Sequence, residues 1–241
     1  MSRIALLVSC ALPLLTAVPG AQNYKLSELY RAQGTGIGNF ATAGGWTVFV
    51  ENQTPFSSLL WGVPNDRSRR PVLLHDSAAQ GQLTSFQISP DGTHVVYTIS
   101  TNRVRLHSIA TDGSGGRRTL NGLLEEFQNV GSFTISPDST RVAFTVANEL
   151  FSRAIDASTP LVKLNGFFFE GGGVRTGFRF SPDSAWIVWR ADQQAFDVIG
   201  LYSAPADGSG PTRRLDPHRP LADVQADFAI FSAGCTTIPV Y

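Results

Sequence analysis

The sequence predicts an all-β fold built from repeated units, and three observations carry this prediction. First, one phrase with a Ser-Pro-Asp core occurs three times, at Ser85–Gly92, Ser132–Ser139 and Gly177–Ser184. Second, the prolines of successive copies are 47 and 45 residues apart. Third, each copy is followed by short segments rich in β-branched and aromatic residues, which favour strands. A repeat of this length, with short strands and turn residues, is typical of β-propeller blades.

The unit that begins with the first copy shows the pattern in full. Ser89–Gly92 is a predicted turn, because proline fixes φ and glycine accepts a positive φ. Asp112–Gly116 is a second turn, with the Asp-Gly pair that hairpins favour. The segments around these turns alternate or are rich in strand-forming residues. The unit is therefore predicted to hold four strands, over residues 85–88, 95–99, 104–109 and 117–120.

The other units match this one. The unit before it lacks the Ser-Pro-Asp phrase but keeps Trp46–Val50, Leu59–Val63 and Pro71–Leu74. The two later units repeat the strand segments at 142–146, 149–152 and 161–164, and at 186–189, 200–203 and 212–215. We therefore predict four blades of four antiparallel strands, over residues 35–77, 78–123, 124–168 and 169–222. In the phrases, Phe86, Ile88, Phe133, Ile135, Phe178 and Phe180 should lie on the innermost strands, with Gln87, Thr134 and Arg179 pointing the opposite way.

The C-terminal residues predict an incomplete propeller. Asp227–Ile230 resembles the start of a fifth innermost strand, so we assign a partial blade to residues 223–231. The expected Ser-Pro-Asp is then replaced by Phe231–Cys235, and residues 232–241 form a predicted irregular tail. This pattern indicates a propeller truncated or frameshifted near residue 231. The competing possibility is a closed four-bladed ring, in which residues 227–231 pair with the first blade near Trp46–Val50.

The repeated residues resemble the WD40-like (PD40) propeller repeat of the TolB family. That signature has an apolar pair, Ser-Pro-Asp-Gly, a strand, and a hairpin with an Asp-Gly turn, as in Phe86–Gly92 and Asp112-Gly113. The match covers most of the chain after about residue 35. The resemblance implies a periplasmic or secreted propeller that serves as an interaction platform, and it implies no catalytic residues.

Residues 1–22 read as a secretory signal peptide, and residues 23–34 as a lead-in to the first blade. The segment has Arg3 near its start, an apolar run over Ile4–Val18, and small residues at Gly20-Ala21 for cleavage. The run is too short for a comfortable membrane span. We therefore expect a periplasmic or secreted protein with no transmembrane span. A minor alternative is a lipoprotein anchored at Cys10, because Leu7–Cys10 resembles a bacterial lipobox.

Composition restricts the classes of partner. The chain has 241 residues with 19 basic and 19 acidic side chains, and loss of Arg3 with the signal leaves 18 basic ones. This balance argues against nucleic acid, which selects a basic surface. With Cys10 removed, Cys235 would be the only thiol, so an intrachain disulfide is not expected. The chain is long enough for one sizeable globular domain.

No catalytic, metal or cofactor site is predicted. The four histidines, at 75, 94, 107 and 218, lack metal-ligand spacing and are expected to be surface or hydrogen-bonded residues. The serines of Gly113–Gly115 and Gly208–Gly210 lie in predicted hairpin turns and do not form the Gly-x-Ser-x-Gly of a hydrolase. The Asp-Gly turns each offer one acid, whereas calcium needs six to eight oxygen ligands.

Two further patterns have both a functional and a structural interpretation. The arginine pairs Arg69-Arg70, Arg117-Arg118 and Arg213-Arg214 are expected to recur at the same blade position, just before the outermost strand. They form either a basic rim for an anionic partner or, as we favour, edge protection. Phe167–Phe169 is either an exposed contact site or, as we favour, packing between blades.

These observations favour a secreted or periplasmic TolB-like propeller, not an enzyme, that acts as an interaction or scaffold module for a protein or a cell-envelope component. One alternative is the propeller of a prolyl-oligopeptidase-type hydrolase whose catalytic domain lies outside this chain. Another is a propeller that binds a small ligand or glycan in its central channel.

Overall fold

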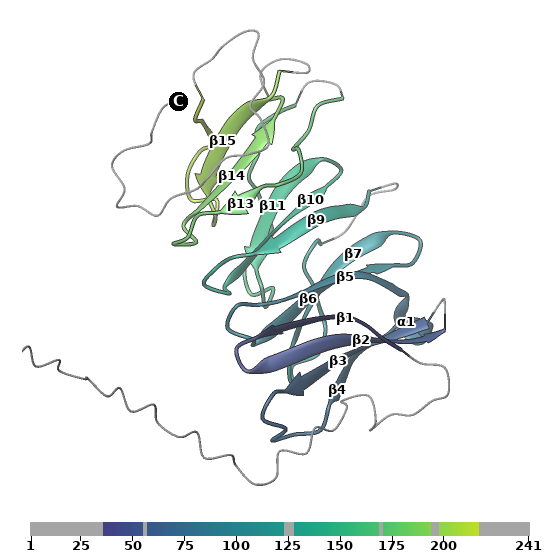
Figure 1. Ribbon diagram of the computed structural model, residues 1–241. Coiled ribbons are helices and arrows are strands. Elements are labelled where there is room, and N and C mark those ends of the chain that lie inside the picture. The colour runs from purple at the N-terminus through teal and green to yellow at the C-terminus, as the bar shows by residue number, and fades with distance from the viewer. Residues whose placement is uncertain (1–35, 55–56, 123–127, 169–170, 194–197, 217–241) are drawn as a thin grey trace, which may run out of the picture. The chain divides into compact units, whose positions relative to one another are not determined.

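Four sheets, each of four antiparallel strands in chain order, make up the part of the chain that the structure describes (Figure 1). The structure is a computed structural model and describes residues 36–54, 57–122, 128–168, 171–193 and 198–216. The first sheet holds β1 (Gly36–Ala43), β2 (Trp46–Thr54), β3 (Ser57–Pro64) and β4 (Val72–Asp76); the second holds β5 (Gln82–Ile88), β6 (His94–Ser100), β7 (Val104–Ala110) and β8 (Arg118–Thr119). The third holds β9 (Val130–Ile135), β10 (Arg141–Val146), β11 (Glu149–Ala154) and β12 (Val162–Lys163); the fourth holds β13 (Arg179–Phe180), β14 (Trp186–Ala191), β15 (Gly200–Pro205) and β16 (Arg213–Arg214).

The predicted all-β class of four-stranded antiparallel units is confirmed. The structure adds β1, which the sequence analysis did not single out, and the short helix α1 (Ser77–Gln80) between the first two sheets. A Gly44-Gly45 turn with two positive φ angles joins β1 to β2, a conformation that two-residue hairpins favour. Helix α1 starts where the Asp76 carboxylate accepts a hydrogen bond from the Ala78 backbone N–H. No helix in the described ranges is long and apolar enough to cross a bilayer.

The Ser-Pro-Asp phrase forms a tight turn held by its own side chains. Ser89 is fully buried, and its hydroxyl donates to Asp91 Oδ1 at 2.6 Å and accepts from the His94 backbone N–H at 3.0 Å. Asp91 Oδ1 also accepts from the Thr93 backbone N–H at 3.0 Å. The turns at Ser136 and Ser181 repeat the bonds of Ser89. A buried hydroxyl that both donates and accepts is fully used, which explains why serine occupies this position in all three copies.

The core lies between consecutive sheets. In β6, Val95 and Tyr97 pack with residues of the first sheet, whereas Val96, which points the other way, packs with residues of the third. Both faces of the second sheet are therefore buried. The third core cluster lies between the third and fourth sheets, where Trp189 and Ile187 are fully buried.

The predicted orientation of the inner-strand phrases is correct where contacts define it. The aromatic and aliphatic members, Phe86, Ile88, Phe133, Ile135, Phe178 and Phe180, pack in the cluster shared with the preceding sheet, although Phe178 lies one residue before β13. Gln87 points toward the following sheet instead, and its Nε2 donates to the Phe133 carbonyl at 3.1 Å. Arg179, at the equivalent position, is exposed.

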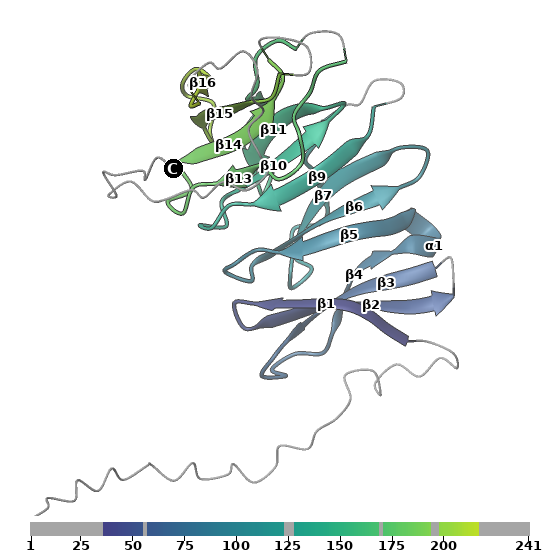
Figure 2. The ribbon, with the colours of Figure 1, turned by 45° about the horizontal axis from the view of Figure 1, so that its top comes forward.

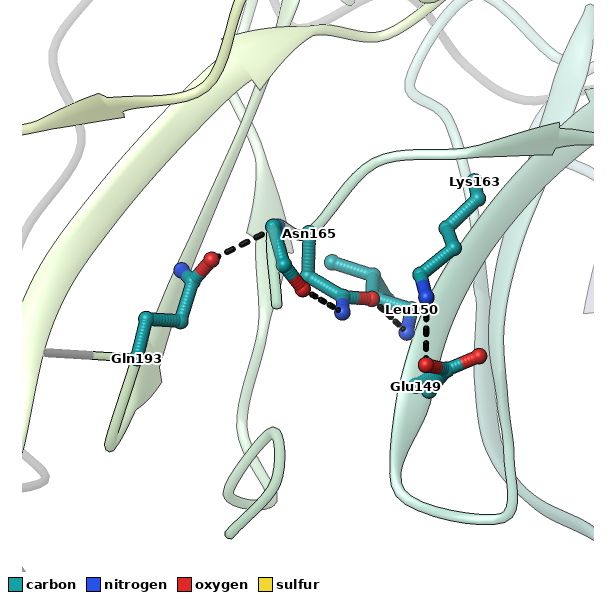
Figure 3. Close-up of polar contacts among 6 residues, drawn as sticks. Glu149, Leu150, Lys163, Asn165 and Gln193 are labelled. Atoms are coloured by element: carbon teal, nitrogen blue, oxygen red, sulfur yellow. Dashed lines mark hydrogen bonds and ion pairs between the residues drawn. The ribbon is translucent and has the colours of Figure 1, made fainter. Parts of the chain in front are cut away.

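A repeated side-chain contact fixes the outer strand to the third strand in the second, third and fourth sheets. Asn165 follows β12, and its Oδ1 accepts from the Leu150 backbone N–H at 2.6 Å (Figure 3). The equivalent bonds join Asn121 to Leu106 and Asp216 to Leu201. Figure 3 also shows the Lys163–Glu149 ion pair between neighbouring strands of the third sheet. In the same view Gln193 of the fourth sheet accepts from the Gly166 backbone N–H, so this segment also links two sheets.

In the competing closed ring, residues 227–231 would pair with Trp46–Val50, but the structure offers no free strand edge there. Trp46–Val50 belongs to β2, whose two edges are already paired with β1 and β3. Several predicted features lie outside the described residues. They are the signal peptide, the lead-in, the Cys10 anchor, the partial blade at 223–231 and the tail at 232–241, together with His218 and Cys235.

Candidate functional site

A prominent concave surface among the described residues is an open groove of about 780 Å³. It is lined by turns and strand ends of the first three sheets: Trp46 from the first, residues 92–94, 108–112, 114–116 and 118 from the second, and Asp156–Ser158 from the third. We call it the rim groove. Because loops and turns on a rigid scaffold carry binding residues more often than strands do, this surface is the first candidate for a site.

One repeated position supplies the large side chains along this rim. Trp46, His94, Arg141 and Trp186 are the first residues of β2, β6, β10 and β14, and each pairs with the last residue of the following strand. Trp46 and His94 line the rim groove, whereas Arg141 and Trp186 line a second groove of about 440 Å³. The fold therefore presents an indole, an imidazole, a guanidinium and a second indole at equivalent places. Different side chains at equivalent backbone positions of a rigid scaffold are typical of a recognition surface.

Carboxylates from the hairpin turns lie beside these side chains. Asp112, Asp156 and Asp207 each accept a backbone N–H from a serine two residues later, at 2.9 Å. Hydrogen bonds from these serines hold the pKa of each carboxyl below its ordinary value, so all three are ionised near neutral pH. Within the described ranges, no group of three or more His, Cys, Asp or Glu is arranged to hold a metal ion. The structure thus agrees with the turn interpretation of these Asp residues.

Two buried hydroxyls form part of the lining of the rim groove. Ser108 and Thr111 are each 1% exposed, and neither hydroxyl has a hydrogen-bond partner among the described residues. Ser152 occupies the position equivalent to Ser108 in the third sheet, where its hydroxyl accepts from Arg141 Nε at 3.1 Å. His94 takes the place of Arg141 in the second sheet and leaves Ser108 unbonded. The rim groove therefore keeps hydrogen-bonding capacity that its neighbour has used.

A third groove, of about 450 Å³, lies between β1 and β5. Its lining contains no ionisable side chain and includes Asn39, Asn52, Thr84 and Phe40. We call it the inner groove. Phe40 is 69% exposed at its edge, which is unusual for a large aromatic side chain.

Three aromatic side chains of the first two sheets form a buried polar cluster. The His75 and Tyr97 rings lie 5.5 Å apart between centroids, and those of Tyr97 and His107 5.9 Å apart. The His75 Nε2 donates to the Gly81 carbonyl at 2.8 Å, since that oxygen can only accept. Burial lowers the pKa of His75, lowers that of His107 to about 4, and raises that of Tyr97 to about 12. Both histidines are therefore neutral, buried members of the interface between sheets, with bonds to Gly81 and Thr119.

The structure corrects the expectation that the arginine pairs recur at one blade position. Arg118 pairs with Ser108, and Arg213 pairs with Ser203, so these two are equivalent. Arg117 is then equivalent to Thr212 and not to an arginine. The other member of each pair also has a different contact. Arg214 forms a 2.6 Å ion pair with Asp216, whereas Arg117 donates a hydrogen bond to the Gln80 side chain. The two-residue outer strands carry no periodic pattern from which the sequence could have fixed this register.

The other candidate residues divide between the two interpretations. Phe168 packs between sheets as expected, whereas Phe167 is 81% exposed, and Phe169 lies outside the described residues. His94 is the first residue of β6 and lies directly after the Ser-Pro-Asp turn. Ser114 and Ser209 lie in hairpin turns, as predicted.

The fold and the grooves define a β module of the propeller type, without a recognisable reaction centre in the described residues. No family model and no curated protein matches the sequence. Solved structures do match. A protein of Agrobacterium tumefaciens assigned as TolB aligns with a TM-score of 0.46 and 17% identity, over 71% of this chain and 61% of that chain. A chain from a structural study of two prolyl endopeptidases and their inter-domain dynamics aligns with a TM-score of 0.55 and 14% identity, over 77% of this chain and 30% of that chain.

The match to the prolyl endopeptidase chain, with a TM-score above 0.5, agrees with the sheet arrangement and confirms the all-β, propeller-like class. The chain spans 61% and 30% of the lengths of these two structures.

Proposed function

We propose that the protein is a periplasmic or secreted, non-catalytic binding module, which holds a protein or cell-envelope component on its rim. The observation that carries the proposal is the rim groove, in which three sheets contribute turns around a cavity of about 780 Å³. Recognition surfaces combine an apolar part with a few convergent polar groups. Here Trp46 and Ile109 supply the apolar part, and Arg118, Asp112 and Asp156 supply the polar groups. The signal-like residues 1–22 support the location.

A photo-crosslinking experiment tests this function. A photoreactive residue at Arg118, which is exposed in the rim groove, should capture a specific partner in the envelope fraction of the source cells. The same residue placed at Leu73, which is exposed on β4 and does not line the rim groove, is the matched control. A product that forms equally at both positions would contradict the proposal.

The absence of catalysis is tested separately. A fluorophosphonate probe should not label any serine of the purified protein, because the sequence has no Gly-x-Ser-x-Gly motif and Ser114 and Ser209 lie in hairpin turns. Covalent labelling of a serine would overturn this part of the proposal.

A second candidate is the propeller part of a hydrolase. The similarity to a prolyl endopeptidase chain, of which this chain covers 30%, favours it. The genomic sequence downstream of codon 230, read in all frames, decides between the candidates. A Gly-x-Ser-x-Gly motif within an α/β-hydrolase pattern would support the hydrolase, and its absence would support the binding module.

A further inference from the structure

Strand β1 has an unprotected edge. Among the described strands it pairs only with β2, so no described strand covers the backbone donors and acceptors of its other edge. Residues 36–40 are exposed, with Ile37 at 45% and Phe40 at 69%. The strand contains no charged residue and no proline, which are the usual means by which proteins protect such an edge. An exposed, uncharged edge strand is a template for pairing with another chain.

The inner groove lies directly beside this edge. Figure 2 shows β1 and β5 as neighbouring strands, and residues of both line the groove together with residues of β2 and β3. A Cβ atom on Gly38 would lie 2.9 Å from the Asn52 side-chain amide, so that amide rests against the β1 backbone. Asn39, Asn52 and Thr84 supply neutral donors and acceptors, and no lining residue is charged. A charged side chain would lose its hydration here without gaining a counter-charge.

We propose that β1 is a docking strand for an extended segment of a partner protein, which adds to its free edge and places an uncharged polar side chain in the inner groove. Backbone hydrogen bonds along the edge would supply affinity, and the groove beside it would supply specificity. Phe40 would lose exposed apolar area against the added strand. This inference rests on the proposed function as a binding module, and it names the kind of partner and the second place where it binds.

A synthetic peptide provides the test. The probe is acetyl-Thr-Val-Asn-Val-Thr-Val-Thr-amide, whose β-branched residues favour a strand and whose asparagine suits the groove. Hydrogen exchange of the full chain should show protection of residues 36–43 when the peptide is added. A copy of the peptide with alternate backbone N-methyl groups lacks the donors for the edge and should not bind. A copy with aspartate in place of asparagine should bind roughly tenfold more weakly.

Matched variants locate the site. Phe40→Lys places a charge on the edge and should raise the dissociation constant of the peptide at least roughly tenfold. Leu73→Lys, an equivalent change at an exposed position of β4, should leave it unchanged. Circular dichroism of both variants verifies that the fold is intact.

Several outcomes would overturn the inference. They are absence of peptide binding, equal binding to the Phe40→Lys variant, protection elsewhere than β1, or a dimer of the free protein that Phe40→Lys abolishes. The last result would assign the edge to a second copy. If the peptide fails while crosslinking at Arg118 succeeds, the inference fails alone and the binding function stands. If both fail, both are wrong.

Discussion

The hydroxyl of Ser139 accepts a hydrogen bond from the backbone N–H of Asp91 at 3.0 Å, which ties the Ser-Pro-Asp turn of the second sheet to that of the third. Ser184 and Asp138 repeat this bond between the third and fourth sheets, also at 3.0 Å. Ser139 and Ser184 occupy the place that Gly92 has in the first copy, and both have a positive φ, 65° and 62°. A non-glycine residue in this conformation is strained, so the bond between sheets offsets a cost to the local backbone.

Two substitutions of Ser139 separate these effects. Ser139→Ala keeps the strained φ and removes the hydrogen bond, so it should lower the free energy of unfolding by about 1 kcal/mol. Ser139→Gly also removes the bond but relieves roughly 1 kcal/mol of strain, and it should be close to neutral. Urea denaturation of both variants measures the difference. A glycine variant less stable than the alanine variant would refute this account.

Gly92 should not accept a side chain, although Ser139 and Ser184 occupy the equivalent places, because the β1–β2 turn lies against it. A Cβ atom there would lie 2.5 Å from the Ala43 carbonyl oxygen and 2.8 Å from the Gly44 Cα. Gly92→Ala should therefore destabilise the protein by about 2–3 kcal/mol, through overpacking added to a positive φ of 75°. Gly115→Ala is the control, because its φ is 71° but nothing lies within 4 Å of its added Cβ. It should cost only about 1 kcal/mol. Equal losses in thermal or urea unfolding would show that contact with the β1–β2 turn is unimportant.

The buried histidines should make the protein less stable in mild acid. The folded-state pKa of His107 is lowered by burial to about 4, whereas an unfolded histidine has its ordinary pKa of 6.5. Protons therefore bind preferentially to the unfolded chain between these values. The stability from neutral His107 is complete above pH 6.5, declines as the pH falls, and is lost below pH 4. The decline is on the order of 2–3 kcal/mol.

The pH dependence of the unfolding free energy tests this assignment. His107→Phe should flatten the profile between pH 6.5 and pH 5. Asp91, Asp138 and Asp156 have a pKa lowered from the ordinary value of 3.8, so their stabilising contribution is lost only below that window. An unchanged slope in the His107 variant would contradict the assignment.

Val142 tests the interface between the second and third sheets. It is fully buried in the cluster that also contains Val96 and Leu106. Val142→Ala and Val96→Ala should each lower the free energy of unfolding by about 1–3 kcal/mol, through lost burial and a residual cavity. Leu73→Ala, at a position 44% exposed, should cost less than about 1 kcal/mol. A denaturant midpoint that does not move in the buried variants would place these valines outside the core.

The fold was predictable from sequence where local chemistry determines it. Proline, aspartate and glycine fix the turns, and β-branched runs such as Val95–Ile99 fix the strands between them. Strand β1 was missed because its Gly36–Ala43 sequence has two glycines, no β-branched run and no Ser-Pro-Asp phrase after it. Helix α1 is a four-residue turn that depends on one Asp76 cap, too short to leave a periodic signal.

The candidate site was far less predictable. The rim groove joins Trp46, His94 and Asp156, which are brought together only by the packing of three sheets. The hydrogen bonds that Ser139 and Ser184 accept come from residues 48 and 46 positions earlier in the chain. In the sequence these serines are visible only as replacements for the glycine of the first copy. The repeated first residue of β2, β6, β10 and β14 was the available signal, because aligning the units on their second strands brings Trp46, His94, Arg141 and Trp186 into one column.

The residue after each Ser-Pro-Asp also restricts how such a chain can grow by duplication of its units. Where this residue is a serine, its hydroxyl accepts the hydrogen bond of the Asp N–H in the preceding unit. Gly92 instead packs against the Gly44-Gly45 turn of the preceding unit, which leaves no room for a side chain. A copy of the second unit placed after the third would leave the Asp138 N–H without its hydroxyl. A copy of the third placed after the first would press a side chain into the glycine turn. This residue thus fixes the place of the second unit behind the first, and viable duplications would be those that copy a serine unit behind another unit that contains the Ser-Pro-Asp phrase.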